Sequence, residues 1–318
     1  MKKQTGIVYS DLYLEHDTGG HPESPRRLTA IMDGLNSRGI LENLVPVAPG
    51  RAGAGIIELV HSSSYIKWVE KMVNGGARIL DSGDTVVSEG SFEAARLAAG
   101  GVTAAVDAVM EERVRNCFCV VRPPGHHALH DRAMGFCLFN NVAIGARYVQ
   151  ERYGIERVLI VDWDVHHGNG TQDTFYEDPS VFYFSSHQYP HYPGSGSADE
   201  TGEGAGEGFT LNFPLAAGSG DEDCLRGFRE SLIPAMEEFK PGFVFISAGF
   251  DGHHRDSLSS INLTGEGFRR LTALVGTLAD KYAGGRLVSV LEGGYDLDGL
   301  VESVAEHLLE LSETGSSE

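Results

Sequence analysis

The chain has 318 residues, of which 41% are hydrophobic and 22% charged, and this balance predicts a folded domain with a large core. The 45 acidic residues exceed the 25 basic ones by 20, which argues against nucleic acid or an anionic membrane as a partner, because both attract basic surfaces. No stretch approaches about 18 uncharged apolar residues, and the four cysteines show neither a C-x-x-C pair nor a secretory pattern. We therefore expect a cytoplasmic protein.

Short apolar runs alternate with amphipathic stretches along most of the chain, and this alternation predicts an α/β protein. The runs are continuously apolar, as in strands of a mainly parallel sheet that is flanked by helices on both faces. We expect a single domain over residues 1–311 and a polar tail over 312–318. Strands are predicted at 6–9, 117–121, 157–162, 181–185, 242–247 and 286–291, helices at 91–112, 140–153, 221–239, 264–282 and 298–311, and a long glycine-rich loop at 194–208.

Polar residues directly follow two of the predicted strands. Asp162, Asp164 and His166 alternate from the last residue of the strand at 157–162 onwards. Residues two apart in an extended strand share a face, so these side chains can point into one site. Asp251 follows the strand at 242–247. Aspartates at strand ends are often helix caps. Here an Asp-x-Asp-x-His run at one strand end is matched by a further aspartate at a second strand end, which favours a metal site.

Three protein ligands and an open position are typical of a catalytic metal centre. The ligand types leave the metal open among zinc, iron(II), cobalt and manganese. A binuclear manganese hydrolase of the arginase kind would need a further carboxylate two residues after His166, where this chain has Gly168, so a single metal is favoured.

Two further strand ends carry groups suited to proton transfer. His126 and His127 follow a rigid Pro-Pro-Gly turn after the strand at 117–121, and adjacent histidines can differ in charge when only one has a carboxylate partner. Tyr295 follows a Glu-Gly-Gly turn after the strand at 286–291, where its hydroxyl could donate to a developing oxyanion.

Together these motifs resemble the histone deacetylase and acetylpolyamine amidohydrolase superfamily, with the forms of class II deacetylases and their prokaryotic relatives. The similarity spans about residues 21–309 and implies a single-domain arginase/deacetylase-like fold. It also implies zinc-dependent amide hydrolysis, with Fe²⁺ or Co²⁺ as alternative metals, and a structural K⁺ ion. The segments, in chain order, are 122–128 (RPPGHHA), 135–141 (GFCLFNN), 162–172 (DWDVHHGNGTQ), 247–251 (SAGFD) and 292–295 (EGGY).

The resemblance assigns roles to residues at matching positions. It implies that Asp164, His166 and Asp251 bind zinc, that His127 is the general base, and that Asp162 keeps its neighbour His126 charged. Tyr295 would bind the substrate carbonyl. Further implied positions are the substrate contacts Asp84, Gly135, Phe136, Tyr192 and Leu258, the K⁺ site near Asp162, Asp164, His166 and Ser185, and Arg27 behind the site at an acetate-release channel.

Two substrate classes remain open at this stage: acyl-lysine in proteins or peptides, and small acetylated amines such as acetylpolyamines. Members specialised for polyamines place an acid near the channel mouth, where this chain has Leu258, so acyl-lysine is favoured. A non-catalytic acyl-lysine binding module would lack a metal ligand, His127 or Tyr295, and all are present. An oligomer is compatible with the sequence.

Overall fold

A computed structural model of the chain describes residues 4–81 and 83–313. In this part of the chain one eight-stranded sheet has the strand order β2-β1-β3-β8-β7-β4-β5-β6, and all neighbouring strands pair in parallel. The strands are β1 (Gly6–Val8), β2 (Val45–Val47), β3 (Asn116–Cys119), β4 (Val158–Asp162), β5 (Val181–Gln188), β6 (Thr210–Leu215), β7 (Phe243–Ala248) and β8 (Leu287–Leu291).

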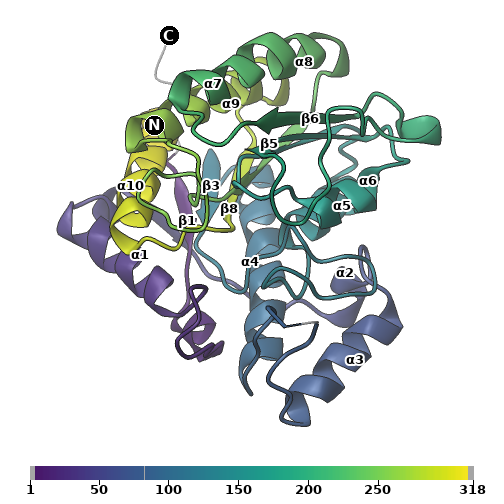
Figure 1. Cartoon of the computed structure of the whole chain (residues 1–318), viewed down its shortest axis with the longest axis vertical. Coiled ribbons are helices and arrows are strands. Elements are labelled where there is room, and N and C mark those ends of the chain that lie inside the picture. Colours follow the sequence, from purple (N-terminus) through teal and green to yellow (C-terminus); the bar gives the residue numbers. More distant parts are fainter. Residues whose placement is uncertain (1–3, 82, 314–318) are drawn as a thin grey trace.

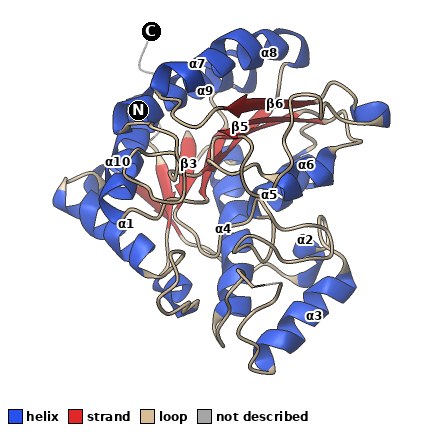
Figure 2. Cartoon of the chain, viewed as in Figure 1, coloured by secondary structure: helices blue, strands red, loops and turns tan. Residues whose placement is uncertain are grey.

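Helices cover both faces of this sheet, as Figures 1 and 2 show. One layer contains α1, α7, α8, α9 and α10, and the opposite layer contains α4, α5 and α6 with α2 and α3 beyond them. The α-helices are α1 (Arg26–Ser37), α2 (Ala54–Ile57), α3 (Ser63–Asn74), α4 (Ser91–Met110), α5 (Asn141–Tyr153), α6 (Asn169–Phe175), α7 (Asp221–Gly227), α8 (Ile233–Phe239), α9 (Gly265–Ala283) and α10 (Leu297–Glu313).

Local sequence explains where the principal helices begin and end. The side chain of Thr264 caps α9 by accepting the N–H of Gly267 at 3.1 Å, and Asn140 caps α5 in the same way. Both helices stop at glycines in the left-handed conformation, Gly154 after α5 and Gly284 after α9. Every residue of the central strands β4, β7 and β8 is buried, which accounts for their mostly apolar sequences.

The predicted α/β architecture is therefore confirmed, with differences at the sheet edges and the termini. The sequence did not predict β2, β6, or the helices α1, α2, α3 and α6. The predicted helix at 221–239 is one helical run in which a π-helical segment, Phe228–Leu232, joins α7 to α8. Of the tail expected at 312–318, Ser312 and Glu313 belong to α10, and residues 314–318 lie outside the described residues.

The strand order sets the place of the functional residues. The carboxyl ends of β3, β8, β7 and β4 lie side by side in the middle of the sheet, and each of them leads into one of the polar motifs. Among the residues described, no helix is both long and apolar enough to cross a bilayer.

Candidate active site

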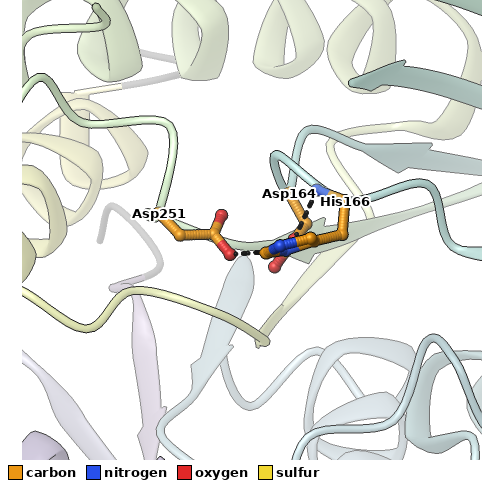
Figure 3. A group of neighbouring side chains, drawn as sticks. All are labelled: Asp164, His166 and Asp251. Carbon is orange, nitrogen blue, oxygen red and sulfur yellow. Dashed lines mark hydrogen bonds and ion pairs between the residues drawn. The ribbon is translucent and has the colours of Figure 1, made fainter. Parts of the chain in front are cut away.

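Asp164, His166 and Asp251 meet where the chain leaves β4 and β7 (Figure 3). One ligand atom of each residue lies within 4.8 Å of those of the other two. His166 Nδ1 is 3.1 Å from Asp164 Oδ1 and 3.0 Å from Asp251 Oδ2. The two carboxylates are fully buried, and the imidazole is nearly so. The structure thus brings together the three residues that the sequence singled out as ligands.

The chemistry of this group fits a divalent cation. Burial, and then the negative charge of Asp164, raise the pKa of Asp251 to about 7, so two buried carboxylates crowd one another when no cation lies between them. The backbone leaves no room for a side chain beside them: a Cβ on Gly249 would lie 2.0 Å from Asp164 Oδ2, and one on Gly293 would lie 2.2 Å from Asp251 Oδ2. Glycine at both positions therefore keeps the carboxylates clear of side chains, and the three ligand atoms lie close enough together to hold a metal ion.

Main-chain hydrogen bonds fix the direction of both carboxylates. Gly293 N–H donates to Asp164 Oδ2 at 2.8 Å, and Val165 N–H donates to Asp251 Oδ1 at 2.9 Å. Asp162 points elsewhere: its Oδ2 accepts from His126 Nδ1 at 3.0 Å and from the Tyr183 hydroxyl at 3.1 Å. The expected common face of residues 162, 164 and 166 is not realised, because β4 ends at Asp162 and the chain turns there.

The rings of His126 and His127 are tilted by 44° with their centroids 4.0 Å apart, and their surroundings shift the two pKa values in opposite directions. Burial would lower the pKa of His126, but the carboxylates of Asp162 and Asp164 outweigh it and raise the pKa to about 10. Burial and the charge on His126 lower the pKa of His127 well below its usual value. His127 Nδ1 lies 2.8 Å from Asn169 Oδ1; since an amide oxygen only accepts, His127 carries its proton on Nδ1 and leaves Nε2 as a base. One ring is charged and the other neutral.

Glu292 holds the turn that presents these histidines, and the sequence reasoning gave it no role. Its Oε2 accepts the main-chain N–H groups of Gly125 at 2.7 Å and His126 at 3.2 Å, and its Oε1 accepts from Ser247 Oγ at 3.2 Å. An acid directly before the Gly-Gly-Tyr turn was the signal available in the sequence. This fully buried side chain thus ties three strand ends together.

Tyr295 faces the site from the turn after β8. Burial and the charge of Asp251 raise the pKa of its hydroxyl well above the usual value, so it stays protonated and can donate. Arg27 lies behind it, with the guanidinium carbon 5.0 Å from the tyrosine ring centroid. Arg27 is itself buried and donates to the main-chain oxygens of Glu292 at 2.5 Å and Gly294 at 2.6 Å. Arg27 thus lies against the turn that carries Tyr295.

Arg27 also belongs to a buried cluster of charges. Glu23 accepts from Arg27 at 3.2 Å and binds Arg122 through both carboxylate oxygens, at 2.5 and 2.8 Å. Arg122 opens the turn that leads to the two histidines. The segment before α1 is therefore attached to the turns after both β3 and β8.

A pocket of about 210 Å³ opens above these groups. Edge-on rings form its walls, with Phe136 5.9 Å from Tyr295 and Tyr192 5.2 Å from His127 between centroids. Gly135 has a positive φ of 55°, and a Cβ there would lie 2.4 Å from His127 Cδ2. The lining comprises all five predicted substrate contacts (Asp84, Gly135, Phe136, Tyr192 and Leu258), the catalytic candidates His126, His127, His166 and Tyr295, and Pro124, Cys137, His191 and Gly293.

His191 is a pocket residue that the sequence reasoning missed. Its ring stacks on His166 with centroids 5.1 Å apart, and its Nε2 lies 3.1 Å from the main-chain oxygen of Leu258. Its position directly before Tyr192 was the only sequence signal. Ser185, expected near a K⁺ ion, is paired in register with Asp162 across β4 and β5, and its Oγ lies 2.8 Å from His187 Nδ1.

A parallel α/β sheet that gathers Asp, His and Tyr side chains around a pocket at its carboxyl edge has the arrangement of an enzyme active site. Residues 21–311 match the histone deacetylase domain. The chain is 43% identical over 298 residues to a probable deacetylase of Archaeoglobus fulgidus, covering 93% of this chain and 82% of that protein. It is 38% identical over 319 residues to a histone deacetylase-like amidohydrolase of Pseudomonas aeruginosa, covering 93% and 82%.

Two further comparisons bear on structure and substrate. The crystal structure of the HDA15 HD domain matches with a TM-score of 0.93 and 38% identity, covering 99% of this chain and 90% of that one. The polyamine deacetylase HDAC10 of Mus musculus is 43% identical over 293 residues, which are 89% of this chain but 43% of that protein. This chain belongs to the histone deacetylase family and is a hydrolytic deacetylase.

Proposed function

We propose that this protein is a zinc-dependent deacylase that removes acetyl or related acyl groups from lysine side chains of proteins or peptides. Asp164, His166 and Asp251 are the residues that would hold the zinc ion. A zinc ion in an open three-ligand site supplies Lewis-acid chemistry, which polarises a carbonyl group and makes water acidic. The proton transfers and the hydrogen bonds to the substrate are made by side chains of the protein.

His127 is the proton-transfer group of this proposal. Its neutral ring offers Nε2 to the proton of the attacking water and then passes that proton to the nitrogen of the leaving amine. Tyr295 donates its hydroxyl proton in a hydrogen bond to the carbonyl oxygen as negative charge develops there. His126 stays cationic beside Asp162 and stabilises the same negative charge. The products are a carboxylate, usually acetate, and a free amine.

The choice of acyl-lysine over acetylpolyamines depends on Leu258. This residue lines the pocket together with His191, whose Nε2 lies 3.1 Å from the main-chain oxygen of Leu258, and this contact supports a fixed position for Leu258. The internal ammonium of a polyamine would lose water against this apolar side chain, which offers it no charge in return. The acetyl-lysine side chain carries no such second charge. Asp84, which lines the same pocket, would accept peptide N–H groups.

Acetylpolyamines are the second candidate, supported by the similarity to a protein named polyamine deacetylase and by the excess of 20 negative charges. The test compares kcat/KM for acetyl-lysine peptides and acetylspermidine at moderate salt, with one metal-defined preparation. We expect the wild type to prefer the peptides and Leu258→Glu to move the ratio towards acetylspermidine. Leu258→Gln, which is polar but uncharged, is the control. A wild type that prefers acetylspermidine would reverse the assignment.

Three finer assignments accompany this proposal. A structural K⁺ ion would bind near Asp162, Asp164, His166 and Ser185, supported by the pairing of the strands that carry Asp162 and Ser185. Acetate would leave past Arg27, supported by the position of this buried cation behind Tyr295. The cytoplasm would be the location.

The K⁺ assignment is tested by comparing the thermal stability of the protein in KCl and in tetramethylammonium chloride at equal ionic strength. Equal stability in the two salts would contradict the assignment.

A further inference from the structure

A second, wider cavity of about 1090 Å³ continues from the mouth of the narrow pocket. We call it the outer groove. Asp84 and Tyr192 line both cavities and so form the boundary between them. Whatever is attached to a substrate held beneath Tyr192 therefore emerges beside this groove. The groove is lined by Ser62, Ser64, Tyr65, Trp68, Leu80, Asp81, Asp84, Asp131, Arg132, Ala133, Met134 and Tyr192.

Hydrogen bonds between its walls form the outer groove before any ligand arrives. Ser62 N–H, at the start of α3, donates to the main-chain oxygen of His130 at 2.9 Å. The Tyr65 hydroxyl donates to the main-chain oxygen of Leu138 at 2.7 Å. Asp81 Oδ1 accepts the N–H groups of Gly83, Asp84 and Thr85 at 2.9 to 3.0 Å. Binding of a ligand therefore costs little conformational entropy of the protein, because these hydrogen bonds already hold the walls in place.

Exposed aromatic side chains line the outer groove. Trp68 is 38% exposed and Tyr192 37% exposed, two of the five large apolar side chains with high exposure in the part of the chain that the structure describes. A third, Ile79, is 44% exposed and precedes the lining residue Leu80. Trp68 stacks on Tyr65 with ring centroids 6.0 Å apart and an angle of 24°, which fixes the indole. Apolar side chains exposed together, unlike scattered ones, mark a binding surface.

The same groove is negatively charged. It contains three carboxylates, Asp81, Asp84 and Asp131, against the single guanidinium of Arg132. A cation that enters this space meets carboxylates and the face of an indole, which together favour Lys or Arg side chains. A cavity of this volume is roughly 10 Å across, the length of about three extended residues. It therefore fits a short stretch of polypeptide beside the acylated lysine.

We propose that the outer groove binds a basic residue of the polypeptide that carries the acyl-lysine, within about three positions of that lysine. The inference rests on the proposed function, because it takes the narrow pocket to hold the acyl-lysine side chain. The occupant is a peptide segment with Arg or Lys, whose charge complements the three carboxylates and whose aliphatic stem packs against Trp68. The preferred substrates are consequently acyl-lysines in basic sequence surroundings.

The test uses peptides with a central acetyl-lysine and Arg, Ala or Glu at each position from three residues before it to three after it. For wild type we expect kcat/KM to be about three- to tenfold higher with Arg than with Ala at one or more positions, and lower with Glu. The gain should shrink at high salt, because the groove is open to solvent. Trp68→Ala and Asp131→Asn should each reduce the gain, whereas hydrolysis of capped acetyl-lysine alone should stay unchanged.

Two matched variants control for general effects of charge and apolar surface. Leu309→Ala removes an apolar side chain of similar exposure from α10, and Glu207→Gln removes an exposed acid outside the groove. Both should keep the full gain with Arg. Circular dichroism verifies that each variant is folded, and the two groove variants change different walls, so one of them serves if the other fails to fold.

The outcomes separate this inference from the proposed function. Equal kcat/KM for the Arg, Ala and Glu peptides in wild type would overturn the role of the outer groove while leaving acetyl-lysine hydrolysis intact. A gain with Arg that both groove variants retain would place the basic residue elsewhere and would also overturn it. Hydrolysis of acetylspermidine without hydrolysis of any peptide or of capped acetyl-lysine would remove the proposed function itself.

Discussion

Asp256 Oδ2 accepts the main-chain N–H of Tyr295 at 2.6 Å. The same oxygen accepts the N–H of Asp296 at 3.0 Å, and Oδ1 accepts the N–H of Leu258, also at 3.0 Å. Asp256 is only 6% exposed, so these bonds are shielded from water. One carboxylate thereby fixes both the turn that carries Tyr295 and the main chain of the pocket residue Leu258.

The hydroxyl of Tyr295 is the first group to test. Tyr295→Phe should lower kcat by on the order of 100- to 1,000-fold, because it deletes one donor to the oxyanion. Metal content and the far-ultraviolet circular dichroism spectrum should not change. Near wild-type turnover on an acetyl-lysine peptide would mean that another group stabilises the oxyanion.

Asp256 should act through Tyr295. Asp256→Asn keeps one acceptor but loses the charge, and we expect kcat to fall by about tenfold, in line with the loss of a charge-assisted hydrogen bond. The effect should largely disappear in a Tyr295→Phe background, since two residues that act as one unit are not additive. Asp298→Asn, at an exposed acid of α10, is the control. Additive losses in the double variant would show that Asp256 only stabilises the fold.

His127→Ala should lower kcat by about 100- to 10,000-fold with little change in KM, because the side chain moves a proton and does not hold the substrate. His167→Ala, at the next buried pair of adjacent histidines, is a control for the loss of a buried imidazole, since its ring bonds to Ser195 and Gln172 and does not line the pocket. A rise in KM with unchanged kcat for His127→Ala would contradict its role as the base.

Asp84 should give peptide binding a pH dependence. Burial, and then the neighbouring Asp81, raise the pKa of Asp84 to about 6, so this carboxyl is neutral below that pH and charged above it. A charged rim carboxylate accepts peptide N–H groups, and we therefore expect KM for peptides to rise as the pH falls through about 6. In Asp84→Asn the KM should be high and independent of pH over that range. A wild-type KM that is flat from pH 5 to about pH 8 would exclude this contribution.

Metal content can be tested without an activity assay. Elemental analysis of protein as purified should find about one divalent metal ion per chain at this site, as expected for three ligands and an open position. Chelation should abolish activity and lower the melting temperature, because a ligand bound only by the folded state stabilises it. Asp251→Asn should bind the ion less tightly, with Asp298→Asn as the matched control. Full activity after metal removal would contradict the assignment.

The central strands could be predicted from the sequence, and the edge strands could not. β4, β7 and β8 are buried on both sides and are therefore mostly apolar along their whole length, with only a buried serine inside β7 and β8. β2 has only three residues, one of them Pro46, and β6 is partly exposed, so neither edge strand has a strong pattern. Short strands at an edge pair along one side only, and their sequences carry correspondingly little information.

Some residues of the site could also be predicted from the sequence, and others could not. His127, Asp164 and Asp251 lie just beyond strand ends, and parallel strands bring such positions to one edge of the sheet. Glu292 and Asp256 act by accepting main-chain N–H groups from other turns, which no spacing in the sequence encodes. Such contacts depend on how the turns pack against one another, and only the tertiary structure supplies that.

The hydrogen bonds of Arg27 also set a time at which the protein becomes active during its synthesis. This side chain holds the main-chain oxygens of Glu292 and Gly294, which lie 265 and 267 positions later in the chain. The ribosome makes Arg27, in the first turn of α1, early in synthesis, and it makes the two partners of Arg27 near the end of translation. The turn that carries Tyr295 therefore closes only when almost the whole chain has emerged, and an unfinished chain cannot remove acyl groups from its neighbours.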